Sequence, residues 1–237
     1  MANKEFLDII QSNIDESGFH ITLVNGGQHP DFSYSIGLTE KLGFELIVAG
    51  GGFVTIKENE SIFEYIYLQL QTGQAVDSKF SLSENHVFYL SKVDSSWCKK
   101  LMLGVYDYYN VNEIKAYQIT PVDRTLDIPL MSEAFMPNDP IWKWLDMDWN
   151  VKAPVNSYVI TDFNALKGKT ITELTRWEDR VWEMFSGPGP DVKEEDVRIV
   201  PLGTILGIDN TLEPIVNLSV GEGLWRESLK SSWNKWE

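Results

Sequence analysis

Residues 30–50 constrain the fold more than any other part of this chain. Phe32, Tyr34 and Ile36 alternate with small residues, which is the period of a strand with one apolar face and one small polar face. The apolar run 44–48 follows after a short turn and predicts a second strand, which ends at a run of glycines. We therefore expect two strands here, and a structural role for this segment in place of a catalytic one.

Periodic segments continue on both sides of these strands. Apolar residues at helical spacing predict helices over 6–17, 58–71, 97–109 and 201–208. Short apolar runs predict further strands over 19–24, 87–93, 115–120, 157–161, 182–186 and 197–200. The turn residues 25–27 should join strands 19–24 and 32–38 into a hairpin, and 211–218 is expected to be a turn or a helix.

This order of elements predicts an α+β protein with two domains, each a mixed or mainly antiparallel sheet with packed helices. A length of 237 residues favours two domains over one. We expect a first domain at 1–136, a connector at 137–156 and a second domain at 157–237. The connector contains Trp142, Trp144 and Trp149, so it is too apolar for a flexible linker and should pack across the seam between the domains.

Composition limits the classes of partner. The chain has 35 acidic and 20 basic residues and a formal net charge of −15, which argues against nucleic-acid binding and favours a basic partner. The alternative is that the charge only keeps the protein soluble. No run approaches the roughly 18 apolar residues of a membrane span, and residues 1–6 do not resemble a signal peptide, so we expect no membrane partner and a cytoplasmic location. Nothing indicates an oligomeric state.

The motifs that would signal an enzyme or a metalloprotein are incomplete. Ser35 lacks the glycine two positions earlier that a nucleophile elbow requires, and the glycines 50–52 lack the residues that complete a phosphate-binding loop. The histidines show no metal-binding spacing, and Cys98 is the only cysteine and is expected to be a buried, inert thiol. We therefore predict no catalytic residue, no metal site and no cofactor.

Glu45 interrupts an apolar strand and needs an explanation. It must face water, pair with a cation such as Arg124, or be an acid with a shifted pKa, and structural pairing is the favoured interpretation. An alternative function is a small-molecule sensor or an enzyme, in which Tyr34, Glu45 and Gln118 would line a pocket of the first domain.

The second half carries a different signal, because tryptophans stand near a run of carboxylates. Aromatic anchors beside acidic residues suit a protein interface. The candidate contacts are Trp182, Asp191, Glu194, Glu195 and Asp196. Two other interpretations remain open: Trp182 is a core residue and the acidic loop is merely solvated, or the two domains are a scaffold that packs only on itself.

The first half resembles a known family. The residues that carry this resemblance are Gly18-Phe19-His20, the segments 32–38 and 44–48, Gly73, and the segment 117–124. They are similar to the bacterial family called domain of unknown function 4262, over residues 1–135. Ser33, Ser35 and Thr120 differ from the family pattern, so any pocket would be altered. The resemblance implies no activity.

The second half resembles another family. The segments 157–162 and 182–187, the acidic loop and the segment 221–227 are similar to domain of unknown function 2185, an immunity-protein family of bacterial polymorphic toxin systems. The resemblance spans residues 157–227. It implies a non-enzymatic protein that neutralises a toxin by tight association. The partner would be a basic toxin such as a nuclease, contacted by Glu194, Glu195 and Asp196.

Overall fold

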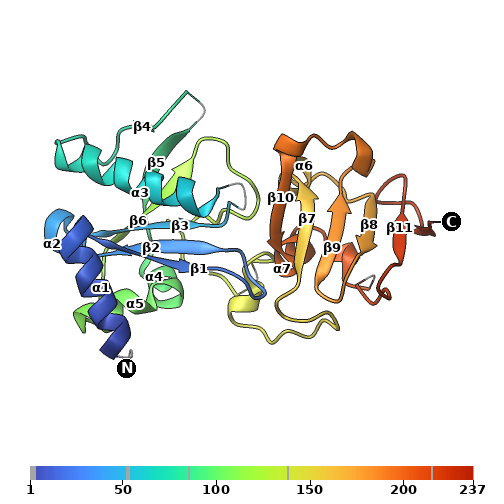
Figure 1. Cartoon of the computed structure of the whole chain (residues 1–237), viewed down its shortest axis with the longest axis horizontal. Helices are drawn as coiled ribbons and strands as arrows, with labels where there is room; N and C mark the ends of the chain where they lie inside the picture. Colours follow the sequence, from blue (N-terminus) through green and yellow to red (C-terminus); the bar gives the residue numbers. More distant parts are fainter. Residues whose placement is uncertain (1–3, 52–53, 85, 138, 215, 237) are drawn as a thin grey trace.

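A computed structural model describes residues 4–51, 54–84, 86–137, 139–214 and 216–236. Two sheets of six strands stand side by side, the first built from residues before 122 and the second from residues after 157 (Figure 1). Each sheet mixes parallel and antiparallel pairs and carries packed helices. The predicted α+β class is confirmed. No helix within the described ranges is both long and apolar enough to cross a membrane.

The first sheet has the strand order β1-β2-β3-β6-β5-β4. These strands are β1 (His20–Val24), β2 (Phe32–Ile36), β3 (Glu45–Ala49), β6 (Ala116–Pro121), β5 (Val87–Lys92) and β4 (Phe80–Ser81). The predicted hairpin is confirmed, because β1 and β2 pair antiparallel around the turn that follows Val24. Among the described strands of this sheet, β3 and β6 form the only parallel pair. It places β3 at the centre of the sheet, where every one of its residues is at least partly buried.

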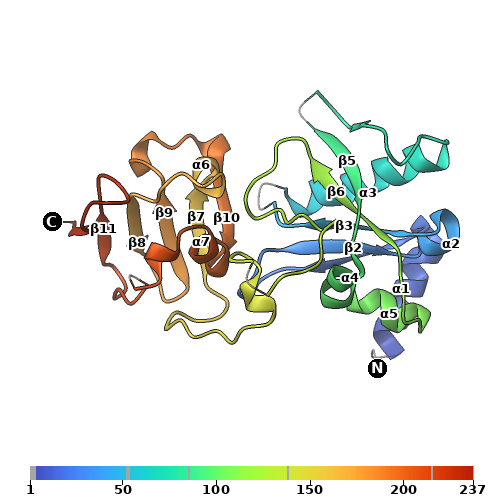
Figure 2. The same cartoon turned by 180° about the vertical axis from the view of Figure 1, so that it is seen from behind.

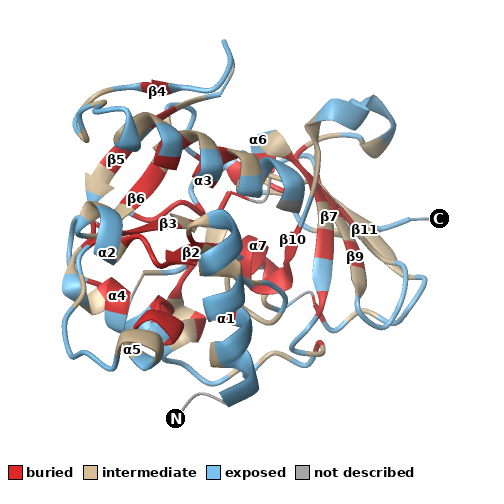
Figure 3. Ribbon diagram, turned by 60° about the vertical axis from the view of Figure 1, so that its left-hand side comes forward, coloured by how far each residue is buried: buried red, intermediate tan, exposed pale blue. Residues whose placement is uncertain are grey.

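Helices cover both faces of the first sheet (Figures 1 and 3). The helices α1 (Lys4–Ser17), α4 (Ser95–Leu101) and α5 (Leu103–Tyr109) enclose one apolar cluster, and α3 (Ile56–Gln71) encloses another on the opposite face. The short helix α2 (Thr39–Leu42) links β2 to β3. The expected helix over 97–109 is confirmed as helical but is not continuous: it is interrupted at Met102. Gly104, just after the interruption, donates its N–H to the Tyr34 hydroxyl at 3.1 Å.

The second sheet has the strand order β10-β7-β9-β8-β11-β12. Its strands are β7 (Tyr158–Asp162), β8 (Glu173–Arg176), β9 (Val181–Phe185), β10 (Val197–Pro201), β11 (Gly223–Trp225) and β12 (Asn234–Lys235). The helices α6 (Phe163–Leu166) and α7 (Leu202–Ile208) pack against it. The segment 211–218 begins within the 3-10 helix η4 (Asn210–Leu212), and residue 215 lies outside the described residues.

The connector packs against both domains, as its tryptophans suggested. The fully buried Trp142 lies in the first core and donates its indole N–H to the Asp127 carbonyl at 3.1 Å. Trp144 contacts Trp149 with ring centroids 4.7 Å apart, and Trp149 packs on the second core. Gln28 of the first domain donates to the Trp144 carbonyl at 3.0 Å. The connector, including the 3-10 helix η1 (Lys143–Leu145), is therefore part of a packed seam between the sheets.

Candidate functional site

Glu45 lies at the start of β3 with its side chain fully buried. Both carboxylate oxygens accept hydrogen bonds from neutral donors. These donors are Ser35 Oγ at 2.5 Å, Thr39 N and Oγ1 at 2.8 Å, Tyr109 Oη at 3.1 Å, Gly37 N at 3.2 Å and Leu38 N at 3.3 Å. The backbone donors belong to the turn into α2, so Glu45 joins this turn to the centre of the sheet.

The expected ion pair of Glu45 with Arg124 is wrong. Arg124 donates instead to the Ile128 carbonyl at 2.6 Å, and no cation contacts Glu45 among the described residues. Burial raises the pKa of the Glu45 carboxyl, while the hydrogen bonds from Ser35, Thr39 and Tyr109 lower it in part. Glu45 is therefore the buried acid with a shifted pKa, held by hydrogen bonds that organise the fold.

Tyr34 and Gln118, the other two residues of the hypothesised pocket, are also engaged internally. Tyr34 is buried and accepts from Gly104, and burial raises the pKa of its hydroxyl. Gln118 donates to the Pro129 carbonyl at 2.9 Å and accepts from the Met131 N–H at 3.3 Å. Both residues pair with Ile47 of β3 in the sheet register. None of these three residues lines any of the five best-formed cavities of the described chain, whose linings are other residues.

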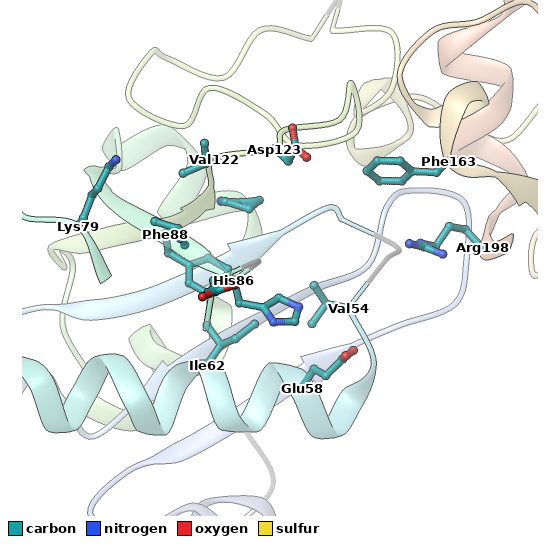
Figure 4. A pocket seen from close by; sticks show the side chains of 13 residues that line it. Val54, Glu58, Ile62, Lys79, His86, Phe88, Val122, Asp123, Phe163 and Arg198 are labelled. Carbon is teal, nitrogen blue, oxygen red and sulfur yellow. The ribbon is translucent and has the colours of Figure 1, made fainter. Parts of the chain in front are cut away.

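The largest of these cavities is a cleft of about 550 Å³ between the two domains (Figure 4). Val54, Glu58 and His86 line its first-domain side. Phe163 and Arg198 approach from the second domain, with the Arg198 guanidinium 5.2 Å from the centre of the Phe163 ring. A hydrogen bond from the Thr55 backbone lowers the pKa of Glu58, and the charges of His86 and Arg198 lower it further. The cleft thus combines charges of both signs with an aromatic wall.

Arg198 is the best placed of these groups to meet a ligand. Its Nη1 donates to the carbonyls of Glu195 and Val197, at 2.7 Å in each case. Its Nε is buried and has no hydrogen-bond partner among the described atoms. Glu58 in contrast is committed to the cap of α3, because it accepts from the Thr55 N–H at 2.8 Å.

The acidic loop lies between β9 and β10 at the surface of the second domain. It folds as two 3-10 turns, η2 (Gly189–Asp191) and η3 (Glu194–Asp196). Asp191, Glu194 and Glu195 are exposed and Asp196 is partly exposed. Glu195 contacts Lys193 at 3.7 Å, with both side chains about three-quarters exposed, so this pair neutralises little of the charge. The structure therefore gathers these four carboxylates on one surface segment.

Trp182 lies apart from that surface. Its side chain is fully buried in the second core, with the Arg176 guanidinium 5.1 Å from the ring centre. Cys98 is buried too, and burial raises the pKa of its thiol to about 11, which suits an inert cysteine. The cleft residues had no signal in the sequence, since Glu58, His86, Phe163 and Arg198 come from separate elements and belong to no motif.

Residues 13–130 match the family described as "Domain of unknown function (DUF4262)". This range contains every strand of the first sheet, and it confirms the resemblance of the first half. No curated protein and no solved structure matches the chain. The resemblance of residues 157–227 to an immunity family stays a prediction.

Proposed function

We propose that this chain, whose first domain belongs to the family of domain of unknown function 4262, is a non-enzymatic protein that binds and neutralises a basic bacterial toxin in the cytoplasm. The observation that carries this proposal is the ordered, exposed acidic loop of residues 191–196 on a protein of net charge −15. Opposite charge on the toxin would accelerate encounter and set the orientation of the complex.

The loop is held in place by its own hydrogen bonds. Asp191 donates its N–H to the Pro188 carbonyl at 3.0 Å, and Asp196 donates to the Lys193 carbonyl at 2.9 Å. Glu173 of β8 accepts from the Gly189 N–H at 2.9 Å and anchors the base of the loop. Because the backbone is already ordered, little conformational entropy would be lost when a partner binds.

The loop carboxylates can be neutralised without changing their shape. In the combined variant Glu194→Gln, Glu195→Gln and Asp196→Asn, we expect the association rate with a basic toxin to fall about tenfold or more, because the steering charge is lost. The dependence of this rate on salt should shrink as well. The direct measurement is surface plasmon resonance at low and high salt, using the product of the adjacent gene as the toxin, with growth rescue as the cellular readout.

The control is the variant Glu178→Gln with Glu227→Gln, which removes two exposed carboxylates of the same domain outside the loop, one fewer than the loop variant. It should bind within about twofold of the wild type, since isolated surface charges contribute little. Unchanged binding and unchanged salt dependence in the loop variant would remove the loop from the proposal. A neighbouring gene product that is neither toxic nor bound would contradict the neutralising function itself.

The interdomain cleft favours a second candidate function, the binding of a small molecule that has an aromatic part and an anionic group. Its volume of about 550 Å³ lies in the usual range of ligand pockets. Phe163 and Phe88 supply aromatic contact, and Arg198 supplies a charged donor. This site differs from the pocket hypothesised around Tyr34, because it lies between the domains.

This second candidate can be tested with an aromatic sulfonate dye, 1-anilinonaphthalene-8-sulfonate. We expect Arg198→Ala to weaken dye binding about tenfold, because a charge-assisted hydrogen bond in a partly closed cleft is lost. Fluorescence titration measures the affinity. The control is Lys230→Ala, which removes an exposed cation outside the cleft lining. Equal affinities of the Arg198→Ala variant and the wild type would exclude this candidate.

A further inference from the structure

The outer edge of β1 is exposed in a way that the other sheet edges are not. β4 and β12, the end strands on the far sides of the two sheets, are two residues long. β10, the remaining end strand, carries Arg198 and ends at Pro201 beside the first domain. Short strands, charged side chains and prolines are the usual protections of a sheet edge. β1 is five residues long and contains no proline, lysine, arginine or carboxylate. Its only titratable residue is His20, whose pKa is lowered by burial.

On its outer side, the backbone of β1 has N–H and C=O groups that pair with no described strand. Its ladder runs to β2 alone, with His20 opposite Ile36 and Val24 opposite Phe32. In a sheet, alternate residues of an end strand turn their N–H and C=O groups outward. Among the described residues, no other backbone hydrogen bond reaches residues 20–24. This edge can therefore accept one more strand.

A hollow lies beside the beginning of this edge, at residues 19–21. It has a volume of about 210 Å³ and is also lined by Asn13 and Ser17 of α1 and by Glu60 and Glu64 of α3. The helices α1 and α3 lie on opposite faces of the sheet, so they form the two walls beside β1 (Figures 1 and 3). Such walls would direct an incoming extended chain onto the strand edge.

The α3 wall of the hollow is acidic, whereas the α1 wall presents the neutral side chains of Asn13 and Ser17. Glu60 and Glu64 are one helical turn apart on α3, and neither forms an ion pair with a described residue. Asp15 and Glu16 occupy the last turn of α1, which has no basic residue. Negative charge at that end opposes the helix dipole and destabilises the helix. Lys41 is engaged elsewhere, because it donates to the Gly18 carbonyl at 2.6 Å. A cationic occupant would offset this unfavourable arrangement.

We propose that an extended basic segment of a partner protein binds along β1 as an additional strand, with its lysine or arginine side chains beside Glu60 and Glu64. Charge selects this occupant over a second copy of the chain, because edge-to-edge pairing of two copies would bring like charges together. The site is distinct from the acidic loop, which belongs to the other domain. The proposal therefore goes beyond the neutralising function and does not depend on it.

The probe is a synthetic peptide of alternating lysine and valine, seven residues long, with blocked ends. A second peptide of the same sequence carries N-methyl groups on alternate residues, so it keeps the charge but cannot complete a strand ladder. We expect the N-methylated peptide to bind at least about tenfold more weakly, measured by fluorescence anisotropy on the full chain. Hydrogen exchange of the β1 amides should slow only with the unmodified peptide.

The variant Glu60→Gln with Glu64→Gln should weaken binding of the unmodified peptide about tenfold, since two charge-assisted contacts are lost. The control variant Glu178→Gln with Glu227→Gln, and the triple variant of the acidic loop, should bind the peptide as the wild type does. Equal binding of the two peptides would overturn the strand-pairing proposal and leave charge attraction alone. Concentration-dependent dimers that protect the same β1 amides would overturn it in favour of a second copy.

Discussion

Replacing Glu45 by leucine is expected to lower the free energy of unfolding by at least about 3 kcal/mol, because buried donors lose their acceptor. Three of these donors are the backbone N–H groups of residues 37–39, which cannot turn away from the site. Glu45→Gln keeps one carbonyl oxygen and should lose less. Urea denaturation at neutral pH measures both variants.

The control for Glu45 is Glu16→Leu, which replaces an exposed glutamate on α1 and should change stability by about 0.5 kcal/mol or less. If the free energy of unfolding of Glu45→Leu lies within about 1 kcal/mol of the wild-type value, the donors must find water or other partners. The role of Glu45 as the acceptor that organises the turn into α2 would then be wrong.

The Glu45 carboxyl should also make the stability of the folded protein depend on pH. Burial raises the pKa of Glu45 in the folded protein, so the folded state binds its proton more tightly than the unfolded state does. The stabilisation is complete below the unfolded pKa and is lost as pH rises through the folded pKa. The contribution of Glu45 therefore decreases from about the ordinary glutamate pKa of 4.5 upward. Denaturation of the wild type at several pH values should show this slope, and Glu45→Leu should lack it.

Substituting alanine for Gly203 is expected to open the seam between the domains and to lower stability by about 3 kcal/mol. Gly203 lies on α7, which faces the connector and the first domain (Figure 2). An added Cβ would collide with the backbone carbonyl of Gln28, which no side-chain rotation can relieve. One turn later, a Cβ on Gly207 would lie 2.5 Å from the Ile141 Cα. Two glycines thus allow α7 to approach the other elements closely.

Helix propensity alone predicts the opposite result for Gly203→Ala, so the measurement distinguishes the two effects. Alanine in a helix is favoured over glycine by roughly 1 kcal/mol, so α7 in isolation would gain stability from the substitution. Small-angle X-ray scattering should show a larger radius of gyration for Gly203→Ala, and trypsin should cleave the connector faster. The far-ultraviolet circular dichroism should stay close to that of the wild type, because both sheets remain folded.

Gly187→Ala is the control for Gly203, since an added Cβ at that position meets no atom within 4 Å. Its scattering curve and proteolysis should match those of the wild type. A Gly203→Ala variant with the same radius of gyration and a higher melting temperature would show that propensity outweighs the contact with Gln28. The close approach of α7 would then not hold the domains together.

The two acidic surfaces divide the binding proposals between the domains. The loop of residues 191–196 belongs to the second domain, and the carboxylates beside β1 belong to the first. Each of these two binding proposals is tested with its own variant and its own probe, so one proposal can be rejected while the other is still tested. A single basic partner could engage both surfaces only if it spans the seam. Combining the loop variant with Glu60→Gln and Glu64→Gln would then reduce the affinity by more than the sum of the two separate effects.

Much of the first domain followed from local pattern. The alternation of Phe32, Tyr34 and Ile36 specified β2, because side chains on a strand point to opposite faces in turn. The glycines after Val24 specified the hairpin, since they supply the left-handed backbone that its turn requires. The strands β8, β11 and β12 escaped prediction, because two to four residues are too few to establish a period and their pairing depends on distant chain segments.

The sequence by itself determined that the chain forms two α+β halves with an acidic surface, because periodicity and net charge are properties of the chain alone. Only the tertiary structure decided the environment of each polar group. It gave Glu45 neutral donors in place of Arg124, buried Trp182 in the core and placed Arg198 in a cleft. It also left β1 as a free edge beside the acidic residues of α3. The physical reason is that hydrogen bonds, burial and cavities join residues far apart in sequence, and no local pattern encodes which ones will meet.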